Sequence, residues 1–191
     1  MKIVFLDRDG VINKDSSGYI KSLPEFEFFP GSLDALRLLT LNGYKIILIT
    51  NQSVINRRMV TEAGLQEIHQ KMTDAVVDHG GRIEAIYYCP HVPEDGCDCR
   101  KPEPGLIYRA QADYGADLSK ACMIGDSIKD IECARLAGCG MAILVRTGHG
   151  KEAERLCRDM GIKPDHVADD LMAAVKWLLG ESPKLKAERD C

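Results

Sequence analysis

The chain has 191 residues, of which 45% are hydrophobic and 28% are charged, and its formal net charge is −4 with an isoelectric point near 5.7. This is the composition of an ordinary globular protein, long enough to bury a substantial core in one domain and too short for two full domains. The sequence shows no basic cluster typical of nucleic-acid binding, and no apolar run long enough for a signal peptide or a membrane span. We therefore expect a cytoplasmic protein without nucleic-acid or membrane partners.

Apolar runs and helical patterns alternate along the chain, which predicts strands separated by helices. The expected strands are 3–6, 45–50, 83–88, 121–124 and 141–145, with a short last strand at 167–168, and the expected helices are 31–42, 61–79, 104–115, 128–138, 151–160 and 169–179. Nearly continuous runs of Ile, Val and Leu are typical of parallel strands covered on both faces. The predicted fold class is therefore α/β with a doubly wound, Rossmann-like parallel sheet. We expect one domain over residues 1–181 and a disordered tail at 182–191.

Two carboxylates follow the first predicted strand. Asp7 and Asp9 come directly after the apolar run 3–6, and side chains two positions apart on a strand point to the same side. Gly10 allows a sharp turn that brings backbone amides close to an anion. One aspartate can be a nucleophile and the other an acid and base, with a divalent cation such as Mg²⁺ between them. An isolated Asp-x-Asp-Gly sequence is equally an ordinary turn, so the motif predicts phosphoryl transfer only together with others.

Three further motifs support phosphoryl transfer, each at a predicted strand end or in a loop. They are T-N-Q-S at 50–53, R-K-P at 100–102 and G-D at 125–126. With D-R-D-G, and in this order, they resemble the signature motifs of the haloacid dehalogenase (HAD) superfamily of phosphohydrolases.

The HAD resemblance implies a division of roles among these residues. Asp7 would attack phosphorus to form an aspartyl phosphate, and Asp9 would protonate the departing oxygen and then activate water. A catalytic Mg²⁺ would be held by Asp7, by the backbone carbonyl of Asp9 and by Asp126. The phosphoryl oxygens would be held by Thr50, Arg100 and Lys101. Asp130 can orient Lys101 or a metal-bound water, or it can simply complement a helix N-terminus.

A cluster of soft ligands predicts a second metal site. Cys89, His91, Cys97 and Cys99 lie within residues 89–99, and three sulfurs with one imidazole nitrogen are a donor set of tetrahedral structural zinc sites. Cys97 and Cys99 are awkwardly close for a disulfide, and the expected compartment is reducing. We expect a structural Zn²⁺ that pins the loop leading to the R-K-P motif, with a redox-reactive thiol pair as the alternative. The remaining cysteines are expected to be free thiols, mostly buried: Cys122, Cys133, Cys139, Cys157 and Cys191.

Within the superfamily, the sequence is similar to the family of heptose 1,7-bisphosphate phosphatases over about residues 3–148. The similarity includes Tyr87 and Tyr88 ahead of the cysteine loop and the stretch L-V-R-T-G at 144–148. It implies removal of the C7 phosphate from D-glycero-D-manno-heptose 1,7-bisphosphate, on the route to nucleotide-activated heptose for the lipopolysaccharide core. We expect a monomer.

Two alternatives remain open from the sequence. Histidinol-phosphate phosphatases share the zinc loop, and its compact spacing fits them at least as well, so histidinol phosphate is a second candidate substrate. A zinc-bearing binding protein on a degenerate HAD fold is the non-enzymatic alternative, disfavoured because every expected catalytic residue is present.

No interval is long enough for the separate cap domain of many HAD enzymes, so we expect loops to select the substrate. The loops in question are 14–30 and 53–60. The expected substrate-binding residues are Asp7, Arg8, Asp9, Asp15, Gly18, Tyr19, Thr50, Asn51, Gln52, Ser53, Arg57, Arg100 and Lys101.

Overall fold

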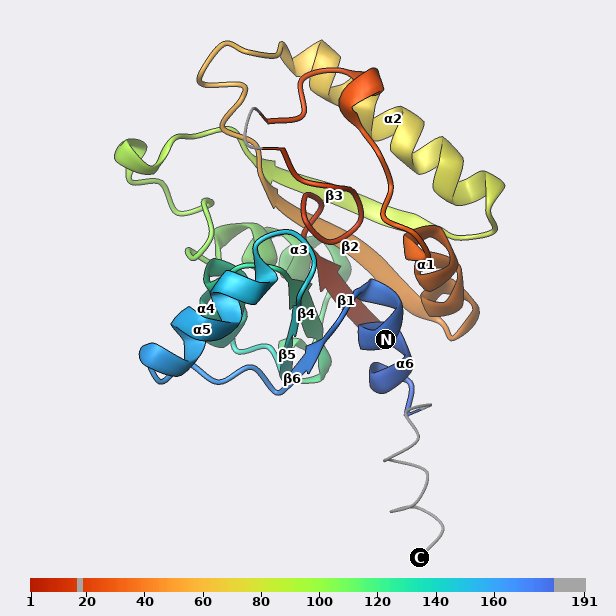
Figure 1. The fold of residues 1–191 in the computed structure, drawn as a ribbon, viewed down its shortest axis with the longest axis vertical. Helices are drawn as coiled ribbons and strands as arrows, with labels where there is room; N and C mark the ends of the chain where they lie inside the picture. The colour runs from red at the N-terminus through yellow and green to blue at the C-terminus, as the bar shows by residue number, and fades with distance from the viewer. Residues whose placement is uncertain (17–18, 181–191) are drawn as a thin grey trace, which may run out of the picture.

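A computed structural model, which describes residues 1–16 and 19–180, contains one sheet of six parallel strands within those residues (Figure 1). The strand order is β3-β2-β1-β4-β5-β6. The predicted class, α/β with a doubly wound parallel sheet, is confirmed. The strands are β1 (Lys2–Leu6), β2 (Tyr44–Asn51), β3 (Ile83–Cys89), β4 (Cys122–Gly125), β5 (Met141–Val145) and β6 (His166–Ala168).

Within the described part of the chain, three helices cover each face of the sheet. On one face α3, α4 and α5 pack against the strands, and on the other face lie α1, α2 and α6 (Figure 1). The helices are α1 (Ser32–Leu41), α2 (Glu62–Asp78), α3 (Gly105–Tyr114), α4 (Ile128–Ala137), α5 (Gly150–Asp159) and α6 (Leu171–Leu178).

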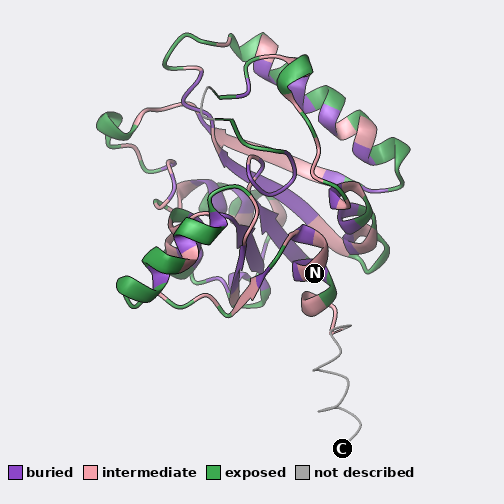
Figure 2. Cartoon of the chain, in the orientation of Figure 1, coloured by how far each residue is buried: buried purple, intermediate pink, exposed green. Residues whose placement is uncertain are grey.

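The two covered faces explain the unbroken apolar runs in the sequence. Along β1, Ile3 and Phe5 face the helices α3 to α5, whereas Val4 and Leu6 face the opposite layer. Each such side chain contributes roughly 1.5–3 kcal/mol when it is fully buried. The inner strands β1, β2, β4 and β5 are accordingly buried along most of their length, whereas the edge strands β3 and β6 are mostly half-buried and the outer helix surfaces are exposed (Figure 2).

Helix and strand limits lie within one to two residues of those expected, but three short 3₁₀ helices were not anticipated. They are Leu23–Glu25, Pro93–Asp95 and Leu118–Lys120. Helices of a single turn are too short for apolar periodicity to reveal. The tail expected at 182–191 lies outside the described residues.

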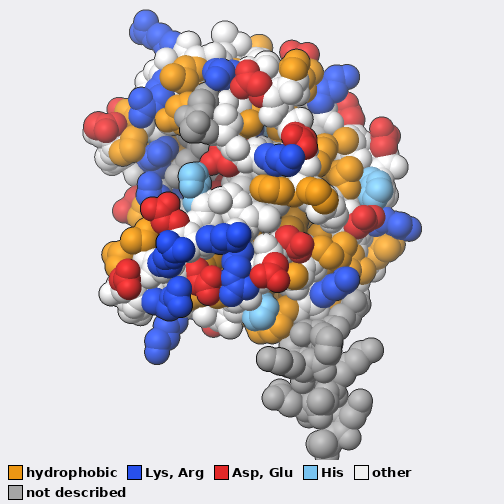
Figure 3. Space-filling model, viewed as in Figure 1, with side chains coloured by type: hydrophobic (Ala, Val, Ile, Leu, Met, Phe, Trp, Pro, Cys, Tyr) orange, Lys and Arg blue, Asp and Glu red, His pale blue; other side chains and the backbone are white. Residues whose placement is uncertain are grey.

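The surface agrees with the charge balance of the sequence. Acidic and basic side chains are interspersed over the face shown in Figure 3. Among the helices of residues 1–16 and 19–180, none has the length and hydropathy needed to cross a membrane.

The strand order sets the position of the site. From β1 the chain builds outward through β2 to β3, and then returns to place β4 on the other side of β1. The carboxyl ends of parallel strands share one edge, and the crevice between β1 and β4 is the switch point at which open α/β sheets bind ligands. The loops that follow β1, β2 and β4 carry three of the four phosphohydrolase motifs.

Candidate active site

Asp7 is the first residue after β1, and its carboxylate contacts a buried lysine. The Asp7 N–H donates to the carbonyl of Ile124 on β4 at 3.0 Å. Lys101 Nζ lies 2.9 Å from Asp7 Oδ2 and 2.6 Å from Asp130 Oδ1, and the lysine side chain is only 3% exposed. Burial disfavours the ammonium ion, but the two carboxylates outweigh burial and raise the pKa of Lys101. Lys101 is therefore a fixed cation beside the expected nucleophile.

Three carboxylates converge beside this lysine. Oxygen atoms of Asp7, Asp126 and Asp130 all lie within 4.8 Å of one another. Burial raises the pKa of Asp7 to about 7, although Lys101 acts in the opposite direction. Burial, with the charges of Asp7 and Asp130, also raises the pKa of Asp126 to about 8. The cluster has more negative charge than one ammonium balances, and hard oxygen donors suit Mg²⁺, so these residues fit a divalent cation.

The turn after β5 packs directly on Asp126. The N–H of His149 donates to Asp126 Oδ2 at 2.8 Å, and Thr147 Oγ1 donates to the carbonyl of Gly10 at 2.6 Å. Gly10 has a φ of 80°, and a Cβ there would lie 2.0 Å from Asp126 Oδ2. Glycine is therefore required at position 10 both by its backbone conformation and by this close approach.

Asp9 lies in different surroundings from Asp7. Its carboxylate accepts hydrogen bonds from the Arg8 guanidinium at 2.8–3.2 Å, from Asn13 Nδ2 at 2.8 Å and from Gln52 Nε2 at 2.8 Å. Burial works against the ionised form, but the charge of Arg8 and these hydrogen bonds prevail and lower the pKa of Asp9. Asp9 is thus an anion at neutral pH in this arrangement.

The segment after β2 connects the two halves of the site. Asn51 Nδ2 donates to the Lys101 carbonyl at 3.2 Å, and Asn51 Oδ1 accepts from the Lys101 N–H at 3.1 Å. Gln52 Nε2 also donates to Thr50 Oγ1 at 3.0 Å. The side chain of Asn51 therefore fixes the backbone of Lys101 across the end of the sheet.

A cavity of about 230 Å³ opens above these groups. Nine of the residues expected at the site line it, and they are Asp7, Asp9, Asp15, Tyr19, Thr50, Asn51, Gln52, Arg100 and Asp126. The remaining lining residues are Ile20, Ser127, Lys129 and His149.

Several expected substrate-binding residues do not line this cavity. The Arg8 side chain is completely buried and directed at Asp9, so only its backbone remains available to a substrate. Ser53 is also buried. Arg57 is exposed, with its Cζ 5.9 Å from the ring centroid of Tyr19. Gly18 lies outside the described residues.

Two of the expected Mg²⁺ ligands, the carboxylates of Asp7 and Asp126, lie together, and Asp130 joins them. The Asp9 side chain is engaged by Arg8, which leaves the backbone carbonyl as the group that Asp9 can offer to the metal. Asp130 additionally accepts a hydrogen bond from the Ser127 N–H at 3.0 Å, which forms a capping box at the start of α4. Asp130 therefore both caps a helix and contacts Lys101.

Cys89, His91, Cys97 and Cys99 come together as one cluster. The Sγ–Sγ separations are 3.2–3.6 Å, and His91 Nδ1 lies 3.6 Å from Cys89 Sγ and 3.3 Å from Cys99 Sγ. These separations far exceed the ~2.05 Å of a disulfide. They approach the edge of about 3.8 Å that follows from Zn–S bonds of ~2.3 Å in a tetrahedron. The cluster therefore fits one tetrahedral metal ion.

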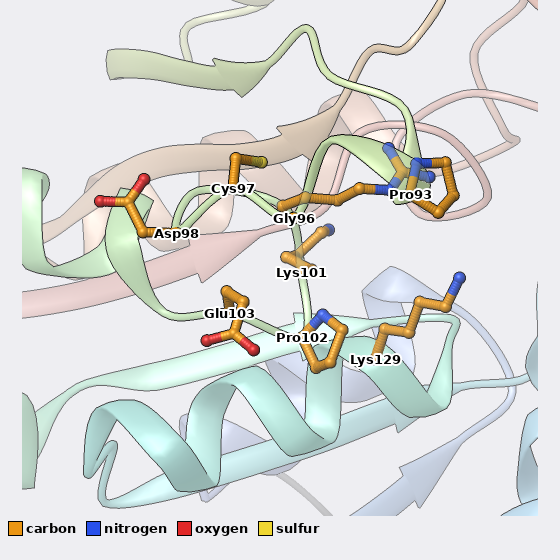
Figure 4. A pocket seen from close by; sticks show the side chains of 9 residues that line it. Pro93, Gly96, Cys97, Asp98, Lys101, Pro102, Glu103 and Lys129 are labelled. Carbon is orange, nitrogen blue, oxygen red and sulfur yellow. The ribbon is translucent and has the colours of Figure 1, made fainter.

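Arg100 links this cluster to the catalytic cavity. Its Nη1 donates to the carbonyl of His91 at 3.0 Å. Arg100 and Lys129 line both the catalytic cavity and a neighbouring cavity of about 460 Å³. In Figure 4, Lys129 extends from the start of α4, and Lys101 lies between α4 and the segment that carries Gly96 and Cys97.

Four polar residues around the site lie outside the sequence motifs and were not expected there: Asn13, Lys129, His149 and His69. His149 Nε2 in fact lies 2.9 Å from Asp15 Oδ2, and His69 Nε2 lies 3.0 Å from Arg8 Nη1. The only signal for His149 was its position after the L-V-R-T-G stretch.

Comparison with known proteins agrees with this geometry. A family model described as HAD-hydrolase-like matches residues 98–174. The chain is 41% identical to the D-glycero-beta-D-manno-heptose-1,7-bisphosphate 7-phosphatase of Bordetella bronchiseptica, over 95% of this chain and all of that protein. It is 45% identical to the Pseudomonas aeruginosa protein of the same name, over 93% of this chain and 97% of that protein.

Solved structures give the same relationship. The crystal structure of D,D-heptose 1,7-bisphosphate phosphatase from B. bronchiseptica, complexed with magnesium and phosphate, superposes with a TM-score of 0.88 at 41% identity and covers 95% of this chain and all of that one. The enzyme from Burkholderia thailandensis superposes with a TM-score of 0.72 at 30% identity, over 94% of this chain and 99% of that one. Because similarity at this level extends over nearly the whole length, the chain belongs to the D-glycero-β-D-manno-heptose-1,7-bisphosphate 7-phosphatase family of the HAD superfamily.

Proposed function

We propose that this protein is a Mg²⁺-dependent phosphatase that removes the C7 phosphate of D-glycero-β-D-manno-heptose 1,7-bisphosphate, a step toward nucleotide-activated heptose for the lipopolysaccharide core. The observation that carries the proposal is the contact of Asp7 with Lys101, beside Asp126, at the base of a cavity between β1 and β4. One relative of known structure, which is 41% identical, is complexed with magnesium and phosphate.

In the first half of the reaction, a carboxylate oxygen of Asp7 forms a bond to phosphorus. The bond between phosphorus and the C7 oxygen breaks, its electron pair stays on that oxygen, and the oxygen takes a proton from Asp9. Because Asp9 is an anion in the free protein, it must enter this step with a proton gained from solvent, or kept from the water of the preceding turnover. Thr50, Lys101 and Arg100 hold the charge that develops on the phosphoryl oxygens. When bound by Asp7, Asp126 and the Asp9 carbonyl, Mg²⁺ supplies charge neutralisation and keeps Asp7 ionised.

In the second half, water attacks the phosphorus of the aspartyl phosphate. The water gives a proton to Asp9, the bond from Asp7 to phosphorus breaks, and inorganic phosphate leaves. The hydrogen bonds from Arg8, Asn13 and Gln52 to Asp9 support this step, because they favour the carboxylate that a base must present.

The Cys/His cluster is assigned a structural Zn²⁺. Four protein ligands leave no open position for a substrate or a water. The hydrogen bond from Arg100 to the carbonyl of His91 supports the view that the metal holds the residues that follow Cys99 in place.

Arg100 and Lys129 are assigned to the second phosphate of the substrate. Both cations line the catalytic cavity and the neighbouring one, so an anionic group that extends from the reacting phosphate meets positive charge. Histidinol phosphate carries an ammonium group instead, which these cations would repel. This charge arrangement favours the bisphosphate.

The test is phosphate release with Mg²⁺ from heptose 1,7-bisphosphate and from histidinol phosphate at matched concentrations. We expect a strong preference for the bisphosphate. Lys129→Met should raise KM for the bisphosphate, while the control Lys71→Met, at an exposed position of α2, should not. Preference for histidinol phosphate would contradict the substrate assignment, and absence of release from any phosphate, including an aryl phosphate, would favour the non-enzymatic alternative.

A further inference from the structure

Arg8 is a completely buried guanidinium whose donors are distributed over three partners. Nε and Nη2 donate to the Asp9 carboxylate, Nη2 also reaches Gln52 Oε1 at 3.1 Å, and Nη1 lies 3.0 Å from His69 Nε2. A buried cation needs its donors satisfied, because an unpaired polar group away from water is costly. His69 is the one partner of Arg8 among these that comes from a helix, α2, and not from the strand-end loops of the site.

The chemistry of this contact fixes the state of the imidazole. A guanidinium can only donate hydrogen bonds, so His69 Nε2 must accept, and its proton must be on Nδ1. His69 is 7% exposed. Burial and the charge of Arg8 lower the pKa of His69 to about 3, against a smaller opposite effect of Asp9. The ring is neutral throughout the physiological pH range.

We propose that His69 is a positioning residue, which holds Arg8 by accepting from Nη1 and thereby sets the direction in which Arg8 presents the Asp9 carboxyl to the reacting oxygen. This inference rests on the proposed function, since it concerns the proton donor of the same reaction. Arg8 contacts Asp9 with two nitrogens at once, so any rotation of the guanidinium plane moves the carboxyl with it. Without an acceptor at position 69, Nη1 would have to turn toward another acceptor.

The choice of substrate can separate this role from a general structural one. A sugar alkoxide is a poor leaving group and needs a proton as its bond to phosphorus breaks, whereas a nitrophenolate leaves as a stable anion. Loss of correct Asp9 placement should therefore slow phosphoryl transfer from the sugar and leave transfer from the aryl phosphate nearly unchanged. Because kcat/KM covers only the steps through formation of the aspartyl phosphate, it isolates this half of the reaction.

The experiment measures kcat/KM for heptose 1,7-bisphosphate and for p-nitrophenyl phosphate with saturating Mg²⁺. His69→Leu, which removes the acceptor, should lower the sugar-to-aryl ratio by about tenfold or more, within the ~10²–10⁴-fold that a positioned proton donor contributes. His69→Gln, whose Oε1 can accept from Nη1, should recover most of the ratio. His79→Leu, at the exposed C-terminal end of the same helix, should leave the ratio unchanged.

An equal loss for both substrates, or an unchanged ratio in His69→Leu, would overturn the inference. If His69→Leu fails to fold by circular dichroism, His69→Met, which fills the site with a poor acceptor, takes its place in the same comparison. Wild-type enzyme that does not hydrolyse the sugar bisphosphate would instead contradict the proposed function.

Discussion

Asp7 and Asp9 lie two positions apart in the same turn and yet have opposite electrostatic surroundings. Asp7 shares the Lys101 ammonium with Asp130, and burial raises its pKa to about 7. The Asp9 carboxylate pairs with the Arg8 guanidinium and accepts from two amide donors, and its pKa is lowered. Asp7 therefore depends on an added cation to be fully ionised at neutral pH, whereas Asp9 does not.

Replacing Asp7 by Asn should abolish turnover, because an amide cannot form the aspartyl phosphate. The fold should persist, since Asn is nearly isosteric and removes one of three crowded carboxylates. The measurement is phosphate release together with the thermal unfolding midpoint. Asp34→Asn, which changes an exposed carboxylate on α1, should retain full activity. Phosphate release by Asp7→Asn would mean that another residue is the nucleophile.

Among the elements, the turns after β1 and β5 are packed against each other without spare room. Gly10 and Gly148 both approach Asp126, and a Cβ on either would lie about 2 Å from its Oδ2. The loop after β3 is held by its cysteine ligands instead of by apolar packing. These segments are held rigid in different ways, by close packing in one case and by cysteine ligands in the other. A single substitution can therefore remove one source of rigidity and leave the other intact.

Gly10→Ala should lower both stability and activity. The left-handed backbone alone costs an L-residue roughly 1–2 kcal/mol, and the new methyl group must also displace Asp126. Gly43→Ala is the matched control, because Gly43 has a φ of 76° with no atom within 4 Å of an added Cβ. Urea unfolding and kcat should show a larger loss of stability, and a loss of activity, only at position 10. Equal effects of the two substitutions would show that Asp126 can move freely.

The wild-type protein should bind about one zinc ion per chain. Cys97→Ser should lower this zinc content and the thermal unfolding midpoint, because hydroxyl oxygen is a poor zinc ligand. Activity should fall as well, since Arg100 is attached to this loop through His91. Metal analysis and thermal unfolding are the measurements. Cys157→Ser, at a buried cysteine outside the cluster, should keep its zinc. Unchanged zinc content in Cys97→Ser would mean that the ligand set is wrong.

For the molecule as a whole, the site joins segments that one sheet brings together from residues 7 to 149. A cation that binds only the assembled cluster must stabilise the entire fold by mass action. The carboxylates of Asp7 and Asp126 repel one another in its absence. Catalytic metal binding and global stability are therefore linked.

Mg²⁺ should raise the thermal unfolding midpoint, by an amount equivalent to about 2.7 kcal/mol at a hundredfold excess over Kd. Asp126→Asn should remove most of this increase while leaving the metal-free protein folded. Differential scanning calorimetry across a Mg²⁺ series measures both. Asp117→Asn, at a partly exposed carboxylate that pairs with Lys120, should respond like the wild type. If Mg²⁺ raised the unfolding midpoint of Asp126→Asn as much as that of the wild type, the cation would have to bind outside this cluster.

The fold was predictable because its inner strands are buried on both faces. Successive side chains of such strands must be apolar, so the strands appear in the sequence as nearly unbroken apolar runs. The family was also predictable, because the residues that identify it directly follow strands or stand in one short loop. His69 and His149 could not be found in this way. Their partners Arg8 and Asp15 are 61 and 134 positions away, and a polar residue on or beside a helix looks the same in sequence whether it faces water or a buried charge.

The position of β1 inside the sheet has a consequence for synthesis. One edge of β1 pairs with β2, but the other pairs with β4, which is made more than a hundred residues later in the chain. Until residues 122–125 have left the ribosome, that edge presents unpaired peptide groups between two apolar faces, which is the form most prone to join a neighbouring chain. The strand that leads to the nucleophile thus has an aggregation-prone edge during synthesis until β4 has been made.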